Sequence, residues 1–454
     1  MRLVDYLHQN AERYPEKTAV ICGGETCSYS RLWQLVSERA ATLPARQVIA
    51  IRTSQTLDFM VTYLAVHLAD SLAAPLEKGM PDGLYREVSG LLAACRAPEG
   101  GADVLYTTGT TGRSKGVVIS HQAMVADAEN LVAGQGFSHD LTFVIHGPLN
   151  HIGSLSKIWP CVMLGATIHI LDGLKDAEAF FQAFSGEGKY ATFFVPANIR
   201  FLLSFDARRF AALADRLDFV ESGGAPLSHA DMQHLCELLP RTRLYNTYAS
   251  TETGIIATYN YNLHLESPAA PVGEDRGEAC GEPGCLGRPM PHSKVIITAE
   301  GKIACQGDTL MSGYIGDPEL TATILHDDTV FMSDYGHIDD AGMLHIGGRE
   351  SDVINVGGYK VAPTEIEDVA MSFEGIADCI CIAADHPVMG KALKLLVVMR
   401  EGAAFSKRAI ARHIADRLEP YKVPMLYEQV ASVARTYNGK LDRKHYKLTG
   451  DSSQ

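Results

Sequence analysis

The segment from Tyr106 to Gly116 has the composition of a loop that binds phosphate. It reads Tyr-Thr-Thr-Gly-Thr-Thr-Gly-Arg-Ser-Lys-Gly, and apolar residues flank it on both sides. Small residues leave backbone amides and hydroxyls open to phosphate oxygens, and the lysine adds a cation. Ser114 stands where a Walker A loop has the glycine before its lysine, which disfavours a P-loop phosphotransferase. We expect this loop to join two strands.

Five further segments carry side chains that could bind a nucleotide or an acid. They are residues 148–153 with Asn150 and His151, residues 222–227, residues 246–252, residues 332–349 with Asp334 and Arg349, and residues 435–441 with Lys440. A carboxylate such as Asp334 can accept two hydrogen bonds, and a guanidinium can donate forked ones. Each segment alone would also suit an ordinary turn or a solvated surface. The order of the segments along the chain therefore decides between a functional and a purely structural interpretation.

In that order, the segments resemble the signatures of the adenylate-forming superfamily, which contains acyl-CoA synthetases, peptide-synthetase adenylation domains and firefly luciferase. The resemblance covers nearly the whole chain. Residues 246–252 resemble the pattern Asn-x-Tyr-Gly-x-Thr-Glu, with Ala249 at the usual glycine. The resemblance implies ATP and Mg²⁺ as cofactors, with Glu252 holding the metal and Thr251 touching the α-phosphate.

The same resemblance implies a nucleotide site. Tyr248 would stack on adenine, Asp334 would accept hydrogen bonds from the ribose hydroxyls, and Arg349 would bind ribose or phosphate. The ATP- and AMP-binding residues expected in this way are Thr107, Thr108, Gly109, Thr110, Thr111, Gly112, Lys115, Gly223, Gly224, Ala225, Asn246, Tyr248, Asp334 and Arg349. The segment at residues 307–314 also matches the family, and we expect it to be structural.

The acid substrate would lie in a separate pocket. By resemblance its lining is Asn150, His151, Pro196, Ser222, Thr247 and Ala249. Relatives that activate α-amino acids generally carry an aspartate between positions 148 and 155, and this chain has none. Because a buried ammonium without a partner is costly, an amino-acid substrate is disfavoured and an acyl or aryl acid is preferred.

The resemblance also implies how the reaction proceeds. The catalytic residues would be Lys440, Glu252, Thr251 and His151, with Lys440 bridging the acid and the α-phosphate of ATP. Ser351 takes the hinge position, where relatives have Asp or Lys, and Gly358 and Lys360 would line a thiol tunnel. The acyl-adenylate would then react with coenzyme A.

Two alternatives stay open. In the first, the acyl group is loaded onto the phosphopantetheine of an acyl carrier protein. In the second, the chain is an inactive relative that only binds nucleotide, as the departures Ala249, Ser333, Ser351 and Ala434 allow.

The pattern of elements predicts an α/β fold in two parts. Short β-rich runs alternate with helix-period segments, including helices at 57–73 and 199–217. Near residue 350 the pattern changes to helix, strand, strand and helix, the last helix with Ile410, Ile414 and Leu418 on one face. We expect a large adenylation domain over residues 1–350 and a small, mobile α+β domain over residues 351–454.

Composition narrows the partners. The chain has 454 residues and a formal net charge of −14, which disfavours nucleic acid. No apolar run is long enough to span a bilayer, and the charged start lacks a signal peptide, so we expect a cytoplasmic protein, monomer or homodimer. The ten cysteines show no paired spacing and are expected to be reduced thiols.

Overall fold

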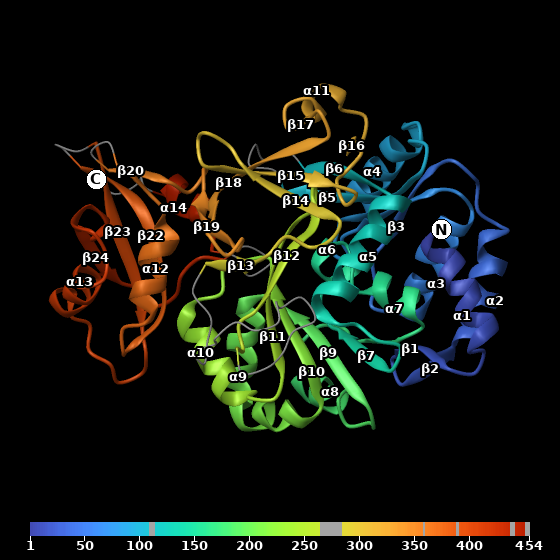
Figure 1. Cartoon of the computed structure of the whole chain (residues 1–454), viewed down its shortest axis with the longest axis horizontal. Helices are drawn as coiled ribbons and strands as arrows, with labels where there is room; N and C mark the ends of the chain where they lie inside the picture. Colours follow the sequence, from blue (N-terminus) through green and yellow to red (C-terminus); the bar gives the residue numbers. More distant parts are fainter. Residues whose placement is uncertain (109–113, 264–283, 357–358, 387–389, 436–440, 450–454) are drawn as a thin grey trace.

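The computed structural model describes residues 1–108, 114–263, 284–356, 359–386, 390–435 and 441–449. The predicted fold class is confirmed: a large α/β part is followed by a smaller C-terminal part (Figure 1). Within the described ranges, no helix combines the length and the apolar character needed to cross a bilayer. Six of the nine cysteines described there are buried.

The largest sheet has eight strands, in the order β12-β11-β10-β9-β7-β8-β1-β2. The six strands from β11 to β1 are parallel, and an antiparallel strand closes each edge. The strands are β1 (Thr18–Cys22), β2 (Glu25–Ser28), β7 (Leu141–Ile145), β8 (Thr167–Ile170), β9 (Lys189–Phe194), β10 (Leu217–Gly223), β11 (Arg243–Ser250) and β12 (Gly254–Asn260). Parallel order brings the carboxyl ends of β10 and β11 to one edge, where ligands bind in such sheets.

A second sheet of five strands carries the phosphate loop. Its order is β16-β6-β5-β4-β3, with β3 (Val48–Arg52), β4 (Leu72–Leu76), β5 (Gly101–Thr108), β6 (Ser114–Ser120) and β16 (Gly313–Tyr314). Strands β5 and β6 are antiparallel, and Thr107 is paired with Lys115 at the end of the ladder. The prediction that the loop joins two strands is therefore confirmed.

The third sheet is antiparallel. It consists of β13 (Cys285–Gly287), β14 (Ser293–Ile297), β15 (Lys302–Gly307), β17 (Leu325–His326), β18 (Thr329–Ile338) and β19 (Leu344–Arg349). It joins the eight-stranded sheet where β12 and β13 meet, through the bridge between Ala257 and Pro289.

Helices cover the sheets of the large part. They are α1 (Leu3–Arg13), α2 (Tyr29–Ala40), α3 (Leu57–Leu68), α4 (Asp82–Ala94), α5 (His121–Gln135), α6 (Ile152–Leu155), α7 (Ile158–Leu164), α8 (Ala177–Gln182), α9 (Pro196–Ala211), α10 (His229–Leu238) and α11 (Pro318–Thr321). The largest core cluster joins α1, α2, α3, α5 and α7 to the strands beneath them.

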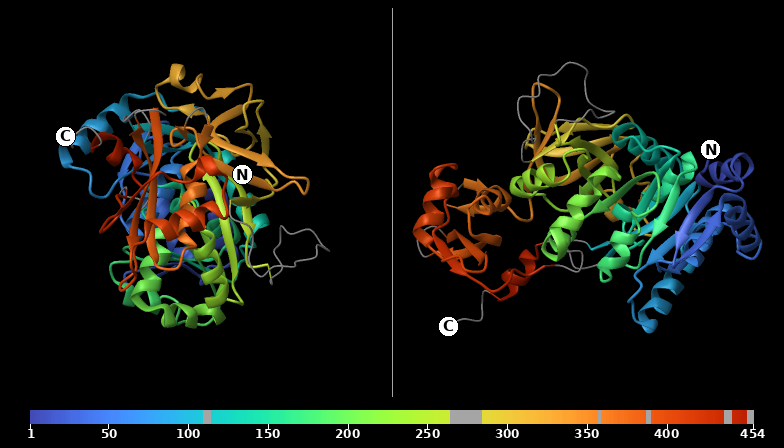
Figure 2. Two further views of the ribbon diagram at one scale, coloured as in Figure 1. Left: turned by 90° about the vertical axis from the view of Figure 1, so that its left-hand side faces the viewer. Right: turned by 90° about the horizontal axis from the view of Figure 1, so that it is seen from below.

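The C-terminal part forms a separate body, on the left of Figure 1, and Figure 2 shows the same separation from below. It contains the hairpin β20 (Ile354–Val356) and β21 (Tyr359–Val361), and a sheet of β22 (Ile376–His386), β23 (Gly390–Met399) and β24 (Leu426–Gln429). Its helices are α12 (Pro363–Met371), α13 (Lys407–Ala415) and α14 (Arg443–Thr449). Ile410 and Ile414 are buried, as their spacing predicts.

Two helix predictions were too long. The helix expected at 57–73 ends at Leu68, because Asp70 adopts a positive φ of 59° and the next apolar run forms β4. The helix expected at 199–217 begins earlier, at Pro196, and is interrupted at Asp206, whose φ is −162°. A short apolar run next to a helix cannot be told from one more helical turn by periodicity alone.

A buried polar network fixes the base of the phosphate-loop strand. The carboxylate of Asp103 in β5 accepts hydrogen bonds from Tyr63 at 2.8 Å and contacts His67 Nε2 at 2.8 Å. Trp159 of α7 donates to the Tyr63 hydroxyl at 2.9 Å. The His121 ring lies 5.5 Å from that of His67. Buried polar groups therefore join helices α3 and α7 to strand β5.

We predict that acid destabilises the protein through buried histidines. Burial lowers the pKa of His121 to about 3 and that of His146 to about 4, so both are neutral when folded. In the unfolded chain they bind protons below about pH 6.5, so stability falls as pH drops through the window from about 6.5 to 4. The expected loss is about 2 kcal/mol per histidine between about pH 7 and pH 5.

Denaturant unfolding at the two pH values measures this loss. His146→Leu should reduce it, whereas His234→Gln, at an exposed position on α10, should leave it unchanged. An equal loss in wild type and His146→Leu would contradict the assignment.

Candidate active site

Lys115 lies at the start of β6, at the exit of the phosphate loop. Its ammonium is 5.3 Å from the ring centroid of Tyr314 in β16, the neighbouring strand. Thr107 is half-buried at the end of β5. Gly109, Thr110, Thr111 and Gly112 lie outside the described residues, as does the side chain of Thr108.

Glu252 follows β11, and its side chain contacts Tyr314 of β16. Its Oε1 accepts a hydrogen bond from the Tyr314 hydroxyl at 3.0 Å, and its carbonyl accepts one from the Met311 amide at 2.9 Å. Burial and the Glu252 charge raise the pKa of Tyr314, so this hydroxyl stays protonated and donates. Thr251 is half-buried beside it. The expected metal ligand and the phosphate-loop lysine therefore share one neighbour.

Tyr248, Asp334 and Arg349 converge from three strands. The Tyr248 hydroxyl donates to Asp334 Oδ2 at 2.6 Å, and Arg349 Nε lies 2.9 Å from Asp334 Oδ1. Asp334 and Arg349 are direct partners in the β18–β19 ladder, which explains their contact. Burial and the Asp334 charge raise the pKa of Tyr248 well above its usual value. Asp334 is buried, whereas the Arg349 side chain is 51% exposed and can reach a ligand.

The ends of β10 and β11 bring two further segments together. Ser222 and Gly223 pair with Asn246 and Thr247 in parallel register. A Cβ on Gly223 would lie 3.0 Å from the Thr247 carbonyl oxygen, and Gly224 has a φ of 75°. Glycine is therefore required for the close approach of the two strand ends, as expected of this turn. Ala225 is half-buried beyond them.

Two of the segments expected to line the acid pocket meet at Phe193. Cβ atoms built on Gly153 and Gly223 would approach its ring at 3.0 Å and 3.3 Å, so the ring lies between those segments. Asn150, His151 and Ala249 are half-buried near the ends of their elements, and Pro196 is buried at the start of α9. The hydroxyls of Ser222 and Thr247 bond within the protein, to the Tyr245 carbonyl at 2.9 Å and the Gln135 amide at 3.1 Å.

Lys157 and Glu221 form a buried ion pair that we did not predict from the sequence. Lys157 Nζ lies 2.8 Å from both Glu221 carboxylate oxygens, and the side chains are each 1% exposed. The ammonium is 5.3 Å from the Phe193 ring centroid, so the pair lies directly behind the expected acid pocket. The signal was one charged residue of each sign inside an apolar run, but nothing in the sequence says that the two meet.

The expected hinge residue, Ser351, lies just after the end of β19. Ser351 is exposed and its hydroxyl donates to Asp352 at 3.1 Å. The amides of Asp352 and Val353 both donate to the Arg349 carbonyl at 3.0 Å. The tunnel residue Gly358 and the side chain of Lys360 lie outside the described residues.

Lys440 also lies outside the described residues, but the two ends of its segment are placed. Arg435 and Leu441 form an antiparallel bridge, and the Arg435 guanidinium lies 2.6 Å from Asp378 Oδ2. The other Asp378 oxygen is 3.9 Å from Arg200 of α9 in the large part. The segment that contains Lys440 therefore starts from a charge contact between the two parts.

The polar and charged side chains of the described residues fit Mg·ATP. Glu252 offers a carboxylate next to the cation Lys115, which matches a metal shared between one protein carboxylate and phosphate oxygens. The Asp334 and Arg349 pair offers an acceptor and a forked donor, as a ribose requires. One protein carboxylate suffices for Mg²⁺, since it usually keeps waters and binds phosphates.

We predict that Glu221→Gln strongly destabilises the protein. The substitution leaves the Lys157 ammonium buried without a counter-charge, which should cost about 3–5 kcal/mol in the free energy of unfolding. The double variant with Lys157→Met should recover most of this loss, because both charges are then absent. As a control, Lys78→Ala breaks the exposed pair with Asp172 and should cost about 1 kcal/mol or less. Equal losses for Glu221→Gln and Lys78→Ala in urea unfolding would refute the prediction.

Comparison with known proteins agrees with this geometry. Residues 93–315 match the family described as AMP-binding enzyme, and residues 365–440 match its C-terminal domain. The sulfoacetate–CoA ligase of Cupriavidus necator is 28% identical over 76% of this chain and 66% of its own length. A probable CoA ligase of Humulus lupulus is 23% identical over 97% of this chain and 95% of its own. The crystal structure of ATP-bound MatB from Rhodopseudomonas palustris has a TM-score of 0.83 at 21% identity, over 99% of both chains. This chain therefore belongs to the AMP-binding enzymes of the adenylate-forming superfamily, with an acyl-CoA synthetase-like architecture.

Proposed function

We propose that this chain is an AMP-forming acid–thiol ligase. It activates a carboxylic acid with ATP as an acyl-adenylate and transfers the acyl group to coenzyme A. The observation that carries the proposal is the buried Asp334 carboxylate, which holds Tyr248 at 2.6 Å and Arg349 at 2.9 Å. This cluster lies in the same large part as Glu252 and Lys115, so nucleotide and phosphate groups have complementary partners in one region.

The residues act by positioning and by charge. The acid and the α-phosphate of ATP are both anions, so the reaction needs cations and donors where charge builds up. Lys115 and the amides of the phosphate loop bind the departing diphosphate, and Glu252 is the protein ligand for Mg²⁺. When bound, Mg²⁺ neutralises phosphate charge. Thr251 and Lys440 contact the α-phosphate side of the reaction, and no protein nucleophile is needed.

An aryl or acyl acid is the proposed substrate class. The half-buried Phe193 ring forms one wall between the segments of Gly153 and Gly223, and an aromatic wall suits an apolar acyl group. Lys157 carries a positive charge nearby, but Glu221 neutralises it. We therefore do not propose a substrate that places an α-ammonium group or a second anionic group in this pocket.

Two conformations are proposed for the two half-reactions. Residues 1–350 form the adenylation domain, and residues 351–454 turn about Ser351, so that Lys440 serves the first half and the β20–β21 hairpin, with Gly358 and Lys360, serves the second. His151 is proposed to line the route between acid and thiol. A carrier-protein phosphopantetheine could use the same route as coenzyme A.

The decisive experiment follows product formation over a panel of aryl and fatty acids. Formation of AMP and diphosphate together supports the proposal, and ADP formation, or neither product with any acid, would reject it. With the best acid, coenzyme A and a phosphopantetheinylated carrier protein are offered in parallel reactions. Thioester on the carrier alone would replace coenzyme A as the acceptor.

We predict that Lys440→Ala separates the two half-reactions. Adenylation, measured as acid-dependent exchange of diphosphate into ATP, should fall about 10²–10³-fold because a charge contact in the transition state is lost. Thiolysis of pre-formed acyl-adenylate should stay near the wild-type rate. Lys407→Ala, an exposed lysine of α13, serves as the control and should affect neither step. If both half-reactions fell equally in Lys440→Ala, the two-conformation scheme would be wrong.

A further inference from the structure

We propose that Tyr314 is a positioning residue for Mg·ATP, whose hydroxyl orients the Glu252 carboxylate and whose ring holds the Lys115 side chain beside it. The inference rests on the proposed function, because it assigns Glu252 to the metal and Lys115 to the phosphates. It adds a residue from a segment that we expected to be mostly structural and to which we assigned no chemistry.

The hydroxyl of Tyr314 makes a directed contact. It donates to Glu252 Oε1 at 3.0 Å, within the ordinary range of a hydrogen bond to a carboxylate. Glu252 is also fixed through its backbone, since its carbonyl accepts from the Met311 amide. A carboxylate held at one oxygen keeps its other oxygen in a defined direction. Outer partners of this kind commonly orient the carboxylates that bind metal ions.

The ring of Tyr314 makes the second contact. Lys115 Nζ lies 5.3 Å from the ring centroid, within reach of a cation–π interaction. Lysine is a flexible point charge, so a face on which its ammonium rests restricts where it can reach. One side chain thus touches both of the charged groups that must meet the metal–triphosphate. A residue present only to fill the core would need neither contact.

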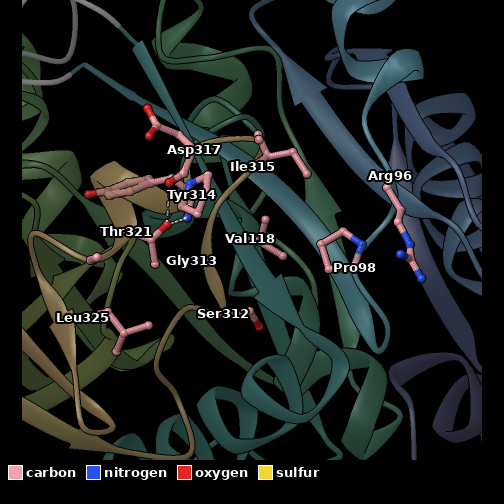
Figure 3. Close-up of a pocket in the computed structure, with 13 residues that line it drawn as sticks. Arg96, Pro98, Val118, Ser312, Gly313, Tyr314, Ile315, Asp317, Thr321 and Leu325 are labelled. Atoms are coloured by element: carbon pink, nitrogen blue, oxygen red, sulfur yellow. Dashed lines mark hydrogen bonds between the residues drawn. The ribbon is translucent and has the colours of Figure 1, made fainter.

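The backbone of Tyr314 is itself firmly held. Gly313 and Tyr314 pair with Val118 and Val117 of β6, the strand that Lys115 belongs to. The Tyr314 amide donates to Thr321 Oγ1 at 2.8 Å (Figure 3). Gly313 has a φ of 137°, which L side chains rarely adopt. In Figure 3 the ring extends away from Arg96 and Pro98, which line the same surface pocket as Tyr314.

The test compares two tyrosine-to-phenylalanine variants. Tyr314→Phe removes only the hydroxyl. Tyr85→Phe is a matched control, since the Tyr85 hydroxyl also donates one bond, to the Ala50 carbonyl at 3.1 Å, and its ring also faces a cation, Arg52 at 4.4 Å. Tyr85 lies on α4. Both proteins are measured by thermal unfolding, so that a folding defect is seen separately.

Metal binding is measured directly. Mn²⁺ is titrated into each protein with a non-hydrolysable ATP analogue, and free Mn²⁺ is followed by electron paramagnetic resonance. Tyr314→Phe should weaken Mn²⁺ binding about tenfold and raise the Mg²⁺ concentration for half-maximal diphosphate exchange by a similar factor. The maximal rate at saturating Mg²⁺ should change much less. Tyr85→Phe should match wild type in both measurements.

A second variant separates the ring from the hydroxyl. Tyr314→Leu should show the same metal defect and also a higher KM for ATP at saturating Mg²⁺, because Lys115 loses its resting face. Unchanged Mn²⁺ and Mg²⁺ dependence in a folded Tyr314→Phe would overturn the inference while leaving the proposed function intact. A wild-type protein that never forms AMP and diphosphate would instead reject the proposed function, and the Mn²⁺ titration would still report on Tyr314.

Discussion

The site depends on pairing a carboxylate that is buried inside the protein. Asp334 is almost completely buried, and its two oxygens are occupied by the Tyr248 hydroxyl and the Arg349 guanidinium. A buried anion is tolerated only when it is paired and hydrogen-bonded, so the positions of these groups are coupled. Tyr248 comes from the large parallel sheet, whereas Asp334 and Arg349 come from the antiparallel one. This buried carboxylate therefore helps to join the two sheets at the proposed nucleotide site.

Buried charged groups are also paired near the expected acid pocket and beneath the phosphate loop. Lys157 and Glu221 neutralise one another behind Phe193, and Asp103 is satisfied by Tyr63 and His67 under β5. In each case a polar contact joins elements that are distant in the sequence. Removing one partner leaves the other buried without a hydrogen-bond partner or water. Such contacts are therefore sensitive to substitution. The site is thus built on a few paired polar groups within an apolar core.

Much of this arrangement could be predicted from local sequence. Residue types and their order gave the phosphate loop between two strands, the α/β class and the smaller C-terminal part. Strands β3, β9, β10 and β14 coincide with short runs that contain β-branched or aromatic residues, which favour strands. The end of α3 was missed because a positive φ at Asp70 leaves no periodic trace. The pairs Tyr314–Glu252 and Lys157–Glu221 were missed because contacts between elements that are distant in the sequence depend on topology, which a single sequence does not encode locally. The roles of the site residues and the boundary near residue 350 stay predictions.

The end of β19 connects the large part to the smaller one. Arg349 is the last residue of β19, and the two amides that follow Ser351 fold back onto its carbonyl. The connection between the two parts is therefore a tight turn without spare length. In the proposed two-conformation scheme, a rotation of the smaller part would act directly on Arg349, which contacts the Asp334 carboxylate proposed to bind the ribose. That scheme would therefore couple nucleotide binding to the angle between the two parts, and a longer linker would uncouple them.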